Sequence, residues 1–509
     1  MRVVKEAQKK LGEVEISKIE FDLTSRDEMP KLLIGLQYIY CTPEIREKVF
    51  KILEDMVPDE VDTKNGRPGM ELWKILVLGT VRLNCNWDYD KLQDIAKNHN
   101  TLRQMLGLGM MDTDKTYGLQ TLRDNLSMFT PEILNRINQV VVKSGHALYN
   151  KINNVTAENK KEVIKIKGKC DSFVVKTDVH YPTDINKLFD AMRKVITLLM
   201  VLCFEVGLSD WRQGKNNLKK IKKIFRKVQN LKRSTSKKAE KKAKREELIN
   251  DAHRCYIDFC QLYLDKAEKT IKKLADINIS IGIKTMMIDN YIKHARREID
   301  QINRRVINGE TIPHSEKVFS IFEEHTEWIC KGKAGVSQEL GLKVCVVEDQ
   351  YRFILHHQVM ENETDDKVAV KIINETMEKF PDFSSCSFDK GFYTPDNRKV
   401  LMDLLESVVL PKKGKLSLKD KRIENSDDFI LDRRKHSGVE SAINALNNHG
   451  LDRCLDHGID GFKRYIALGV LARNIQNLGN IIQKKKVKSL LRSKKIKKTK
   501  EISKHPLVA

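Results

Sequence analysis

The sequence predicts a mixed α/β protein in which an all-helical region precedes a sheet-containing domain that a long helical insertion interrupts. Three observations support this fold class. Apolar residues recur with helical spacing through about residue 150, whereas residues 163–175 carry two short apolar segments, 163–166 and 170–175, that are typical of a largely buried strand. Helical spacing returns over 186–312, and short β-rich runs then alternate with helical segments. That order implies a mixed sheet with helices packed on it.

Residues 1–150 consist of short predicted helices joined by polar turns. Apolar positions over 72–83 predict one helix, Asp88 can cap the next, and Thr130 with Pro131 can begin another. Short helices joined by tight turns in a basic protein permit a helix-turn-helix that reads DNA. A plain helical bundle fits the same pattern, so both interpretations stay open.

Residues 160–185 and 313–483 are predicted to form the sheet domain, and residues 186–312 are predicted to form the insertion between them. The insertion combines apolar stripes at helical spacing with a strongly basic face. Its lysine-rich stretch at 237–245 is either a solvated hairpin tip or a DNA contact.

The rest of the sheet domain is predicted from short apolar runs bounded by turn residues. Strands are expected over 318–322, 342–347, 351–355, 383–388 and 407–410, with helices over 364–379 and 395–406. Residues 484–509 carry many lysines with little apolar pattern. We therefore expect a flexible basic tail that can lie along DNA phosphates.

The charge of the chain predicts a polyanionic partner. Of 509 residues, 93 are Lys or Arg and 70 are Asp or Glu, which leaves a net charge of +23 at pH 7. Hydrophobic residues make up 40% of the chain, which is enough to form hydrophobic cores. The longest apolar run, over 195–208, is too short to span a bilayer. We expect double-stranded DNA as the partner, no membrane span, and a cytoplasmic location with association to the nucleoid.

The ten cysteines are predicted to be free thiols. The first residues lack the apolar core and cleavage site of a signal peptide, so a reducing compartment is expected. The chain has no short CxxC pair, and the nearest approach to metal-ligand spacing is His253, Cys255 and Cys260. Zinc binding is therefore not expected.

Three carboxylates occupy unusual positions. Asp171 lies inside an apolar strand, Asp389 follows the strand at 383–388, and Glu440 lies on a predicted helix from Gly438. If the two strands are neighbours and the helix packs across them, the three carboxylates converge. Their mutual repulsion would then require divalent cations.

Such a cluster suits two Mg²⁺ ions, for which Mn²⁺ can substitute, that promote in-line displacement at a phosphodiester. Lysines on both sides of the predicted strands could hold the DNA backbone near these ions. These candidates are Lys331, Lys333, Lys412, Lys413 and Lys415.

Three segments, 170–184, 388–393 and 436–441, resemble in order the three acidic motifs of DDE-type insertion-sequence transposases, most closely the ISNCY type. The resemblance also covers segments 66–68, 331–335 and 472–479, and so spans most of the chain. It implies an RNase H-like catalytic fold with Asp171, Asp389 and Glu440 as the catalytic, metal-binding triad. Such enzymes cut DNA at the ends of their own element and join the freed 3′ ends to a target. A homodimer or larger assembly is then expected on DNA, because two ends must be held together.

The sequence departs from the family pattern around the last acid. Such transposases often carry Arg or Lys four residues before the Glu and Lys seven residues after it, whereas this chain has His436 and Asn447 there. Arg434 and Lys435 directly precede His436, and we expect these three residues to contact DNA.

The first acid has an alternative in Asp178, an odd number of residues beyond Asp171 on the same strand. The two side chains therefore point to opposite faces, and only one can reach the metals. Asp171 is favoured because it begins the phrase that resembles the family's first motif.

Other polar residues are given ordinary structural roles. Thr183 or Asp184 is expected to cap a helix, and Asp365 and Asp366 suit the positive end of a helix dipole. Two functions remain as alternatives to a transposase: a co-opted or inactive DNA-binding protein, and an RNase H-like nuclease without strand transfer.

Overall fold

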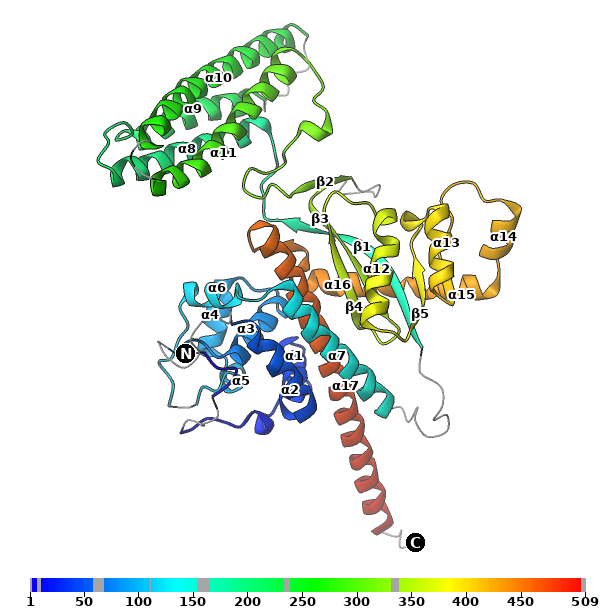
Figure 1. The fold of residues 1–509 in the computed structure, drawn as a ribbon. Coiled ribbons are helices and arrows are strands. Elements are labelled where there is room, and N and C mark those ends of the chain that lie inside the picture. Colours follow the sequence, from blue (N-terminus) through cyan, green and yellow to red (C-terminus); the bar gives the residue numbers. More distant parts are fainter. Residues whose placement is uncertain are drawn as a thin grey trace. The chain divides into compact units, whose positions relative to one another are not determined.

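The fold is that of a computed structural model, which describes residues 2–6, 11–57, 68–109, 111–152, 165–232, 239–275, 277, 279–330 and 338–504 (Figure 1). The chain forms two compact units, one of residues 1–178 with 329–509 and one of residues 179–328. The second unit contains the predicted insertion at 186–312 and extends beyond it at both ends. One reason is that Ile321, outside the predicted range, belongs to its core.

The N-terminal part of the first unit is helical, as predicted. Asp88 caps its helix by accepting a hydrogen bond from the backbone N–H of Lys91, and Pro131 begins another helix. Core side chains of these helices belong to the same hydrophobic core as Val346 of the sheet and Ile475 near the C-terminus. Residues 1–150 therefore share their core with the sheet. The helices are α1 (Met29–Cys41), α2 (Pro43–Glu54), α3 (Leu72–Asn84), α4 (Tyr89–Asn98), α5 (Asn100–Met105), α6 (Leu119–Leu126) and α7 (Pro131–Ile152).

A long helix, α17 (Gly458–Lys504), packs against α1, α3 and α7. Its crossing with α1 is close because glycine lies at the contact on both helices. A Cβ atom on Gly479 would overlap the carbonyl oxygen of Lys31, and one on Gly35 would overlap that of Ile475. The sequence predicts a flexible basic tail over 484–509. The structure continues α17 as far as Lys504, and residues 484–504 contain no glycine or proline to end a helix.

The described residues form a seven-stranded mixed sheet with the order β2-β3-β1-β5-β6, in which β4 pairs with β3 and β7 pairs with β1. β1 is antiparallel to β3, which is antiparallel to β4, whereas β5 and β7 are parallel to β1 and β6 is parallel to β5. The strands are β1 (Ile166–Thr177), β2 (Glu327–Cys330), β3 (Gln338–Asp349), β4 (Ile354–Met360), β5 (Phe383–Phe388), β6 (Ser407–Val409) and β7 (Arg453–Cys454).

Two predicted strands need correction. The strand predicted over 351–355 begins only at Ile354, because the Asp349 carboxylate accepts hydrogen bonds from the N–H groups of Tyr351 and Phe353 and so holds the preceding residues in a turn. Residues 318–322 are irregular, because the Ser320 hydroxyl accepts hydrogen bonds from the backbone N–H groups of Phe322 and Glu323 at 3.2 and 3.0 Å and so turns the chain.

Helices lie on both faces of the sheet. α12 (Asp365–Lys379) packs on β3 and β4, α16 (Gly438–Leu446) packs on β1, and α15 (Asp427–His436) packs on β5 and β6 (Figure 1). α13 (Pro395–Leu404) and α14 (Leu418–Glu424) complete the set around β6 and α15. The face between β1, β5, α15 and α16 carries the acidic residues that the sequence singles out.

The unit of residues 179–328 is a helical bundle with a hydrophobic core of its own. Thr183 caps its first helix by accepting a hydrogen bond from the N–H of Asn186, as predicted. A buried ion pair joins Lys187 to Glu298 at 2.9 Å, and burial raises the pKa of Glu298 to about 7. The helices are α8 (Asp184–Glu205), α9 (Gly214–Lys232), α10 (Ala239–Ala275) and α11 (Ile279–Ile302).

Two further expectations can be compared with the structure. All ten cysteines are free thiols, as predicted. Among the described residues, no helix combines the length and apolar character that crossing a bilayer requires.

Candidate active site

The pairing of β1 with β5 brings two of the predicted acids to one face of the sheet. The strands are parallel, and their last paired residues are Cys170 and Phe388. The next residues are Asp171 and Asp389, and Asp389 keeps an extended backbone, so this register places the two acids side by side. Because side chains alternate along a strand, both point away from the face of Cys170 and Phe388.

Glu440 reaches the same face from α16. This helix packs on β1, and Gly438 in its first turn lies against the Nζ atom of Lys169. Lys169 is two residues before Asp171 and therefore on the same face. Asp389 and Glu440 are exposed, whereas Asp171 is half-buried. A substrate on this face would meet two exposed carboxylates and one half-buried carboxylate.

The electrostatics of Asp171 show that the acids influence one another. Burial raises the pKa of Asp171 to about 6, and repulsion from Asp389, Asp365 and Glu440 adds to this shift. A hydrogen bond from the Ser172 N–H acts in the opposite direction and lowers the pKa. Repulsion of this kind favours a bound cation or a proton.

Asp178, the alternative first acid, lies elsewhere. It follows the last residue of β1 and forms an exposed ion pair with Arg453 at 3.3 Å. Seven residues of extended chain separate it from Asp171, which is about 23 Å at 3.3 Å per residue. Asp389 and Glu440 are among the causes of the pKa shift of Asp171, whereas Asp178 is not.

A fourth carboxylate, Asp365, was missed as a site residue because the sequence explains it fully as a helix-dipole partner. It begins α12 and accepts hydrogen bonds from the Ser172 hydroxyl at 2.7 Å and from Lys343 at 3.0 Å. Gly391, in the turn after Asp389, lies against it: a Cβ atom there would be 3.1 Å from Asp365 Oδ2. The signal that could have found Asp365 is the serine directly after Asp171.

His436, four residues before Glu440, is held by β5. Its Nδ1 atom lies 3.0 Å from the hydroxyl of Ser387, on the same face as Asp389. Burial lowers the pKa of His436, while Asp389 and Glu440 oppose the shift. The imidazole is therefore neutral at pH 7 and acts as a hydrogen-bonding group rather than as a cation.

Lys169 is the basic residue of this face that the sequence analysis missed. Its ammonium lies 3.4 Å from the buried carboxylate of Glu348 on β3. A hollow of about 260 Å³ adjoins it and is also lined by Ser387 and Lys435. The signal was the alternation of β1, which puts Lys169 and Asp171 on one face.

The predicted DNA-binding lysines differ in their surroundings. Lys412 is bound to Asp420 at 2.6 Å, in a cluster that also contains Arg398, so its charge is largely compensated. Lys413, Lys415 and Arg434 are exposed.

Three further candidates complete the list. Lys435 is exposed and pairs with Asp432 at 2.8 Å in its own helix. Lys331 and Lys333 lie outside the described residues.

The donor chemistry of Asp171, Asp389 and Glu440 fits Mg²⁺, a hard cation that prefers carboxylate oxygen. Within the described ranges, however, no three His, Cys, Asp or Glu side chains are gathered closely enough to hold a metal ion. The three acids lie on one face and interact electrostatically, and a bound cation would have to draw them closer together.

Comparisons of the chain with protein-family models, with curated proteins and with solved structures find no match.

Proposed function

We propose that the protein is a DDE-type DNA transposase, which binds the ends of its insertion sequence, cuts the DNA there and joins the 3′ ends to target DNA. One observation carries the proposal. The parallel register of β1 and β5 sets Asp171 beside Asp389, and Glu440 lies near enough to contribute to the raised pKa of Asp171.

The sheet supports an RNase H-like assignment for the catalytic core. β4, β3 and β1 form an antiparallel set, and β5 and β6 run parallel to β1 on its other side. Acids on the central strand, after the adjacent parallel strand and on a helix across that face are the arrangement that the resemblance to DDE transposases implies.

Asp171, Asp389 and Glu440 would hold two Mg²⁺ ions, or Mn²⁺ in their place, which activate a water or a 3′-hydroxyl and stabilise the leaving oxygen of the displacement. The chain's own groups bind and orient the DNA. Lys169 can meet a phosphate at the floor of the site, and neutral His436, fixed by Ser387, can hydrogen-bond the backbone next to it. The exposed Lys413, Lys415 and Arg434 can hold phosphates farther out.

Strand transfer requires two DNA ends in one assembly, so the active species would be a homodimer or larger on DNA. Cleavage and joining would use the same carboxylates, first with water and then with the released 3′-hydroxyl as nucleophile. No covalent link between protein and DNA is involved.

The test is cleavage and joining, with Mg²⁺ or Mn²⁺, of a DNA that carries the element's own ends. Asp389→Asn and Glu440→Gln should each lose at least about 10³-fold in rate, which corresponds to about 4 kcal/mol of transition-state stabilisation. Asp178→Asn is the matched control: it removes an exposed carboxylate just beyond the end of β1, far from the three acids, and should keep wild-type activity.

Each alternative function has a distinct result. Cut products without joined products would indicate a nuclease without strand transfer. DNA binding without cutting by the wild type would indicate a co-opted or inactive DNA-binding protein. Loss of activity in Asp178→Asn, with Asp171→Asn unaffected, would move the first acid to Asp178.

A further inference from the structure

A second basic hollow lies in the same unit, where α7, the β3–β4 turn and α17 meet. This groove, called the α17 groove, has a volume of about 500 Å³. Its lining includes Tyr149, Arg352, Arg473, Lys484, Lys485 and Lys488, and no Asp or Glu is among the described residues that line it. A groove with five cationic side chains and no carboxylate favours a polyanion.

The cations of α17 follow one face of the helix. Arg473 and Lys484 are eleven residues apart, which is close to three full turns, and Lys488 follows one turn later. The row extends over about 22 Å at 1.5 Å per residue. Lys484, Lys485 and Lys488 are exposed, so they can reach a ligand without any change in packing.

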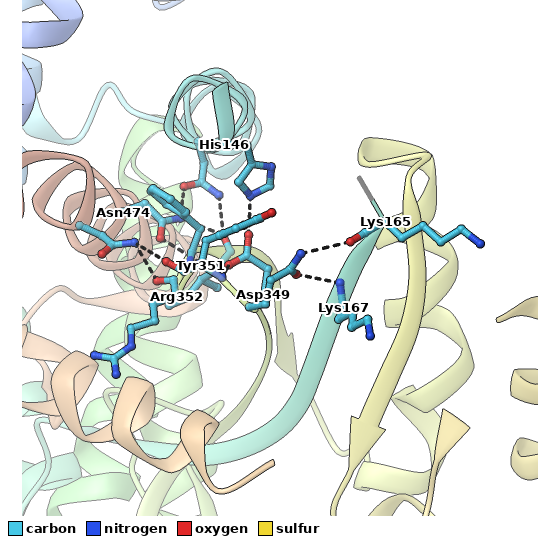
Figure 2. Close-up of polar contacts among 12 residues, drawn as sticks. His146, Lys165, Lys167, Asp349, Tyr351, Arg352 and Asn474 are labelled. Carbon is cyan, nitrogen blue, oxygen red and sulfur yellow. Dashed lines mark hydrogen bonds and ion pairs between the residues drawn. The ribbon is translucent and has the colours of Figure 1, made fainter. Parts of the chain in front are cut away.

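The opposite wall is a rigid turn that presents Arg352. Arg352 has a φ of +68°, a left-handed conformation that an arginine rarely adopts. Asp349 accepts hydrogen bonds from the N–H groups of Tyr351 and Phe353 at 2.8 and 2.9 Å, and the Asn477 amide donates to the carbonyls of Tyr351 and Arg352 (Figure 2). Strained backbone that its surroundings hold this firmly is typical of binding sites.

The network explains the segment 472–479, to which the resemblance gives no role. Asn474 accepts a hydrogen bond from the N–H of Ile354 at 2.9 Å and donates to its carbonyl at 2.8 Å (Figure 2). Asn477 holds the turn, and Arg473 lines the groove. The segment thus fixes and completes the groove.

The α17 groove adjoins the candidate active site. Gln350 lines both this groove and the hollow beside Lys169 and Lys435. Its side chain accepts a hydrogen bond from the N–H of Lys167 at 2.8 Å, four residues before Asp171. Four residues of strand span about 13 Å, which is the axial length of about four base pairs of duplex DNA.

We propose that the α17 groove binds the sugar–phosphate backbone of the DNA that enters the candidate active site, on one side of the scissile bond and about four or more base pairs from it. The inference rests on the proposed function for the identity of the polyanion. The groove contributes affinity and holds the duplex in line with the carboxylates, and it takes no part in the chemistry.

The test measures binding of the full chain to a fluorescein-labelled 40-base-pair duplex of random sequence over a range of KCl concentrations. The groove variant is Lys484→Gln, Lys485→Gln and Lys488→Gln combined. The control variant, Lys269→Gln, Lys272→Gln and Lys293→Gln, removes the same charge from exposed sites in the other unit. Because all six side chains are exposed, both proteins should fold normally, and a thermal melt checks this.

We expect the groove variant to bind at least about tenfold more weakly than wild type at low salt. Its plot of log K against log[KCl] should be shallower by up to about 2.7, since each lost phosphate contact removes about 0.9. Arg352→Gln alone should remove about 0.9. The control should stay within about twofold of wild type in affinity.

Equal salt slopes for the groove and control variants would overturn the groove assignment. The proposed function would then still stand or fall on the cleavage experiment with Asp389→Asn. If the wild type fails to bind the duplex at any salt concentration, both proposals fail together.

Discussion

Asp171 and Asp349 lie on neighbouring strands of one sheet, yet their surroundings are opposite. Asp349 is fully buried and its carboxylate is surrounded by donors: the N–H groups of Tyr351 and Phe353 and the ring of His146 (Figure 2). Asp171 accepts a hydrogen bond from the N–H of Ser172 at 2.7 Å. Burial raises its pKa, and repulsion from Asp389, Asp365 and Glu440 adds to this shift.

The difference distinguishes a structural acid from a candidate functional one. A carboxylate whose oxygens are satisfied by fixed donors stabilises the fold and needs no further partner. A half-buried carboxylate among other carboxylates lowers stability unless a cation joins it, and such perturbed groups gather at functional sites.

The largest expected effect is on activity. Asp171→Ala should reduce DNA cleavage by at least about 10³-fold, or about 4 kcal/mol. Its free energy of unfolding at pH 7 should not fall below that of wild type, because the substitution removes a half-buried charge whose folded-state pKa is raised. Cleavage assays and urea denaturation of the same protein measure both quantities. Cleavage that survives this substitution would contradict the role of Asp171.

Asp349→Ala should give the reverse pattern. Two buried N–H groups and His146 would lose their acceptor, at a cost of about 3 kcal/mol in the free energy of unfolding. At a temperature where the variant remains folded, its cleavage rate at saturating DNA should be close to that of wild type. Only its affinity for DNA should fall, because the turn that presents Arg352 loses the acceptor for its N–H groups. A stable Asp349→Ala protein would remove the basis of the comparison.

The unusual positions of Asp171, Asp389 and Glu440 could be predicted from the sequence, whereas the structural role of Asp349 could not. Asp171 lies in an apolar run, Asp389 follows a strand, and Glu440 lies on a predicted helix. All three are local patterns. The pairing of β1 with β5 is not local, so convergence of the acids could be stated only as a condition.

The rest required tertiary contacts. Asp365 begins a helix, and this position alone accounts for an acidic residue there. Only the hydrogen bond from the Ser172 hydroxyl shows that Asp365 also lies beside the strand that carries Asp171. The sequence also gives no indication of the role of Asn474 and Asn477, because their partners at the β3–β4 turn are more than a hundred residues away in the chain.

The pH dependence of stability sharpens the comparison further. The pKa of Asp171 is raised to about 6 in the folded chain, so the folded state binds this proton more tightly than the unfolded state does. Stability from this group is therefore fully present below about pH 4 and is lost as the pH rises through 6. The total decrease is about 3 kcal/mol, of which about 2 kcal/mol falls between pH 4.5 and pH 7.

Urea denaturation at about pH 4.5 and pH 7 in wild type and Asp171→Asn measures this change, because the difference between the two proteins isolates one group. Saturating Mg²⁺ should restore wild-type stability at pH 7 and leave the variant nearly unchanged. Identical pH profiles for the two proteins would contradict the electrostatic argument.

Asp365 is expected to behave as an intermediate case, since it has both donors and acidic neighbours. Asp365→Asn retains an acceptor for the Ser172 hydroxyl but loses the ion pair with Lys343. We expect about 1 kcal/mol of lost stability and about a tenfold slower cleavage, roughly 1.4 kcal/mol. A loss as large as that of Asp171→Ala would make Asp365 a fourth essential acid.

The smallest effect is expected at the outer end of β1. Lys165 and Glu406 form an ion pair of 2.7 Å, shorter than many contacts of the buried network, but their side chains are 58% and 60% exposed. Water and salt screen such a pair, so Lys165→Gln should change the free energy of unfolding by less than about 0.5 kcal/mol. The carbonyl of Lys165, which accepts a hydrogen bond from Gln350, is unaffected by the substitution.

Denaturation at low and high salt would measure the difference in the free energy of unfolding between Lys165→Gln and wild type, which should vanish at high salt. A loss above about 1.5 kcal/mol would mean that the length of an ion pair, rather than its burial, determines its contribution to stability. The distinction between Asp171 and Asp349 would then lose its physical basis.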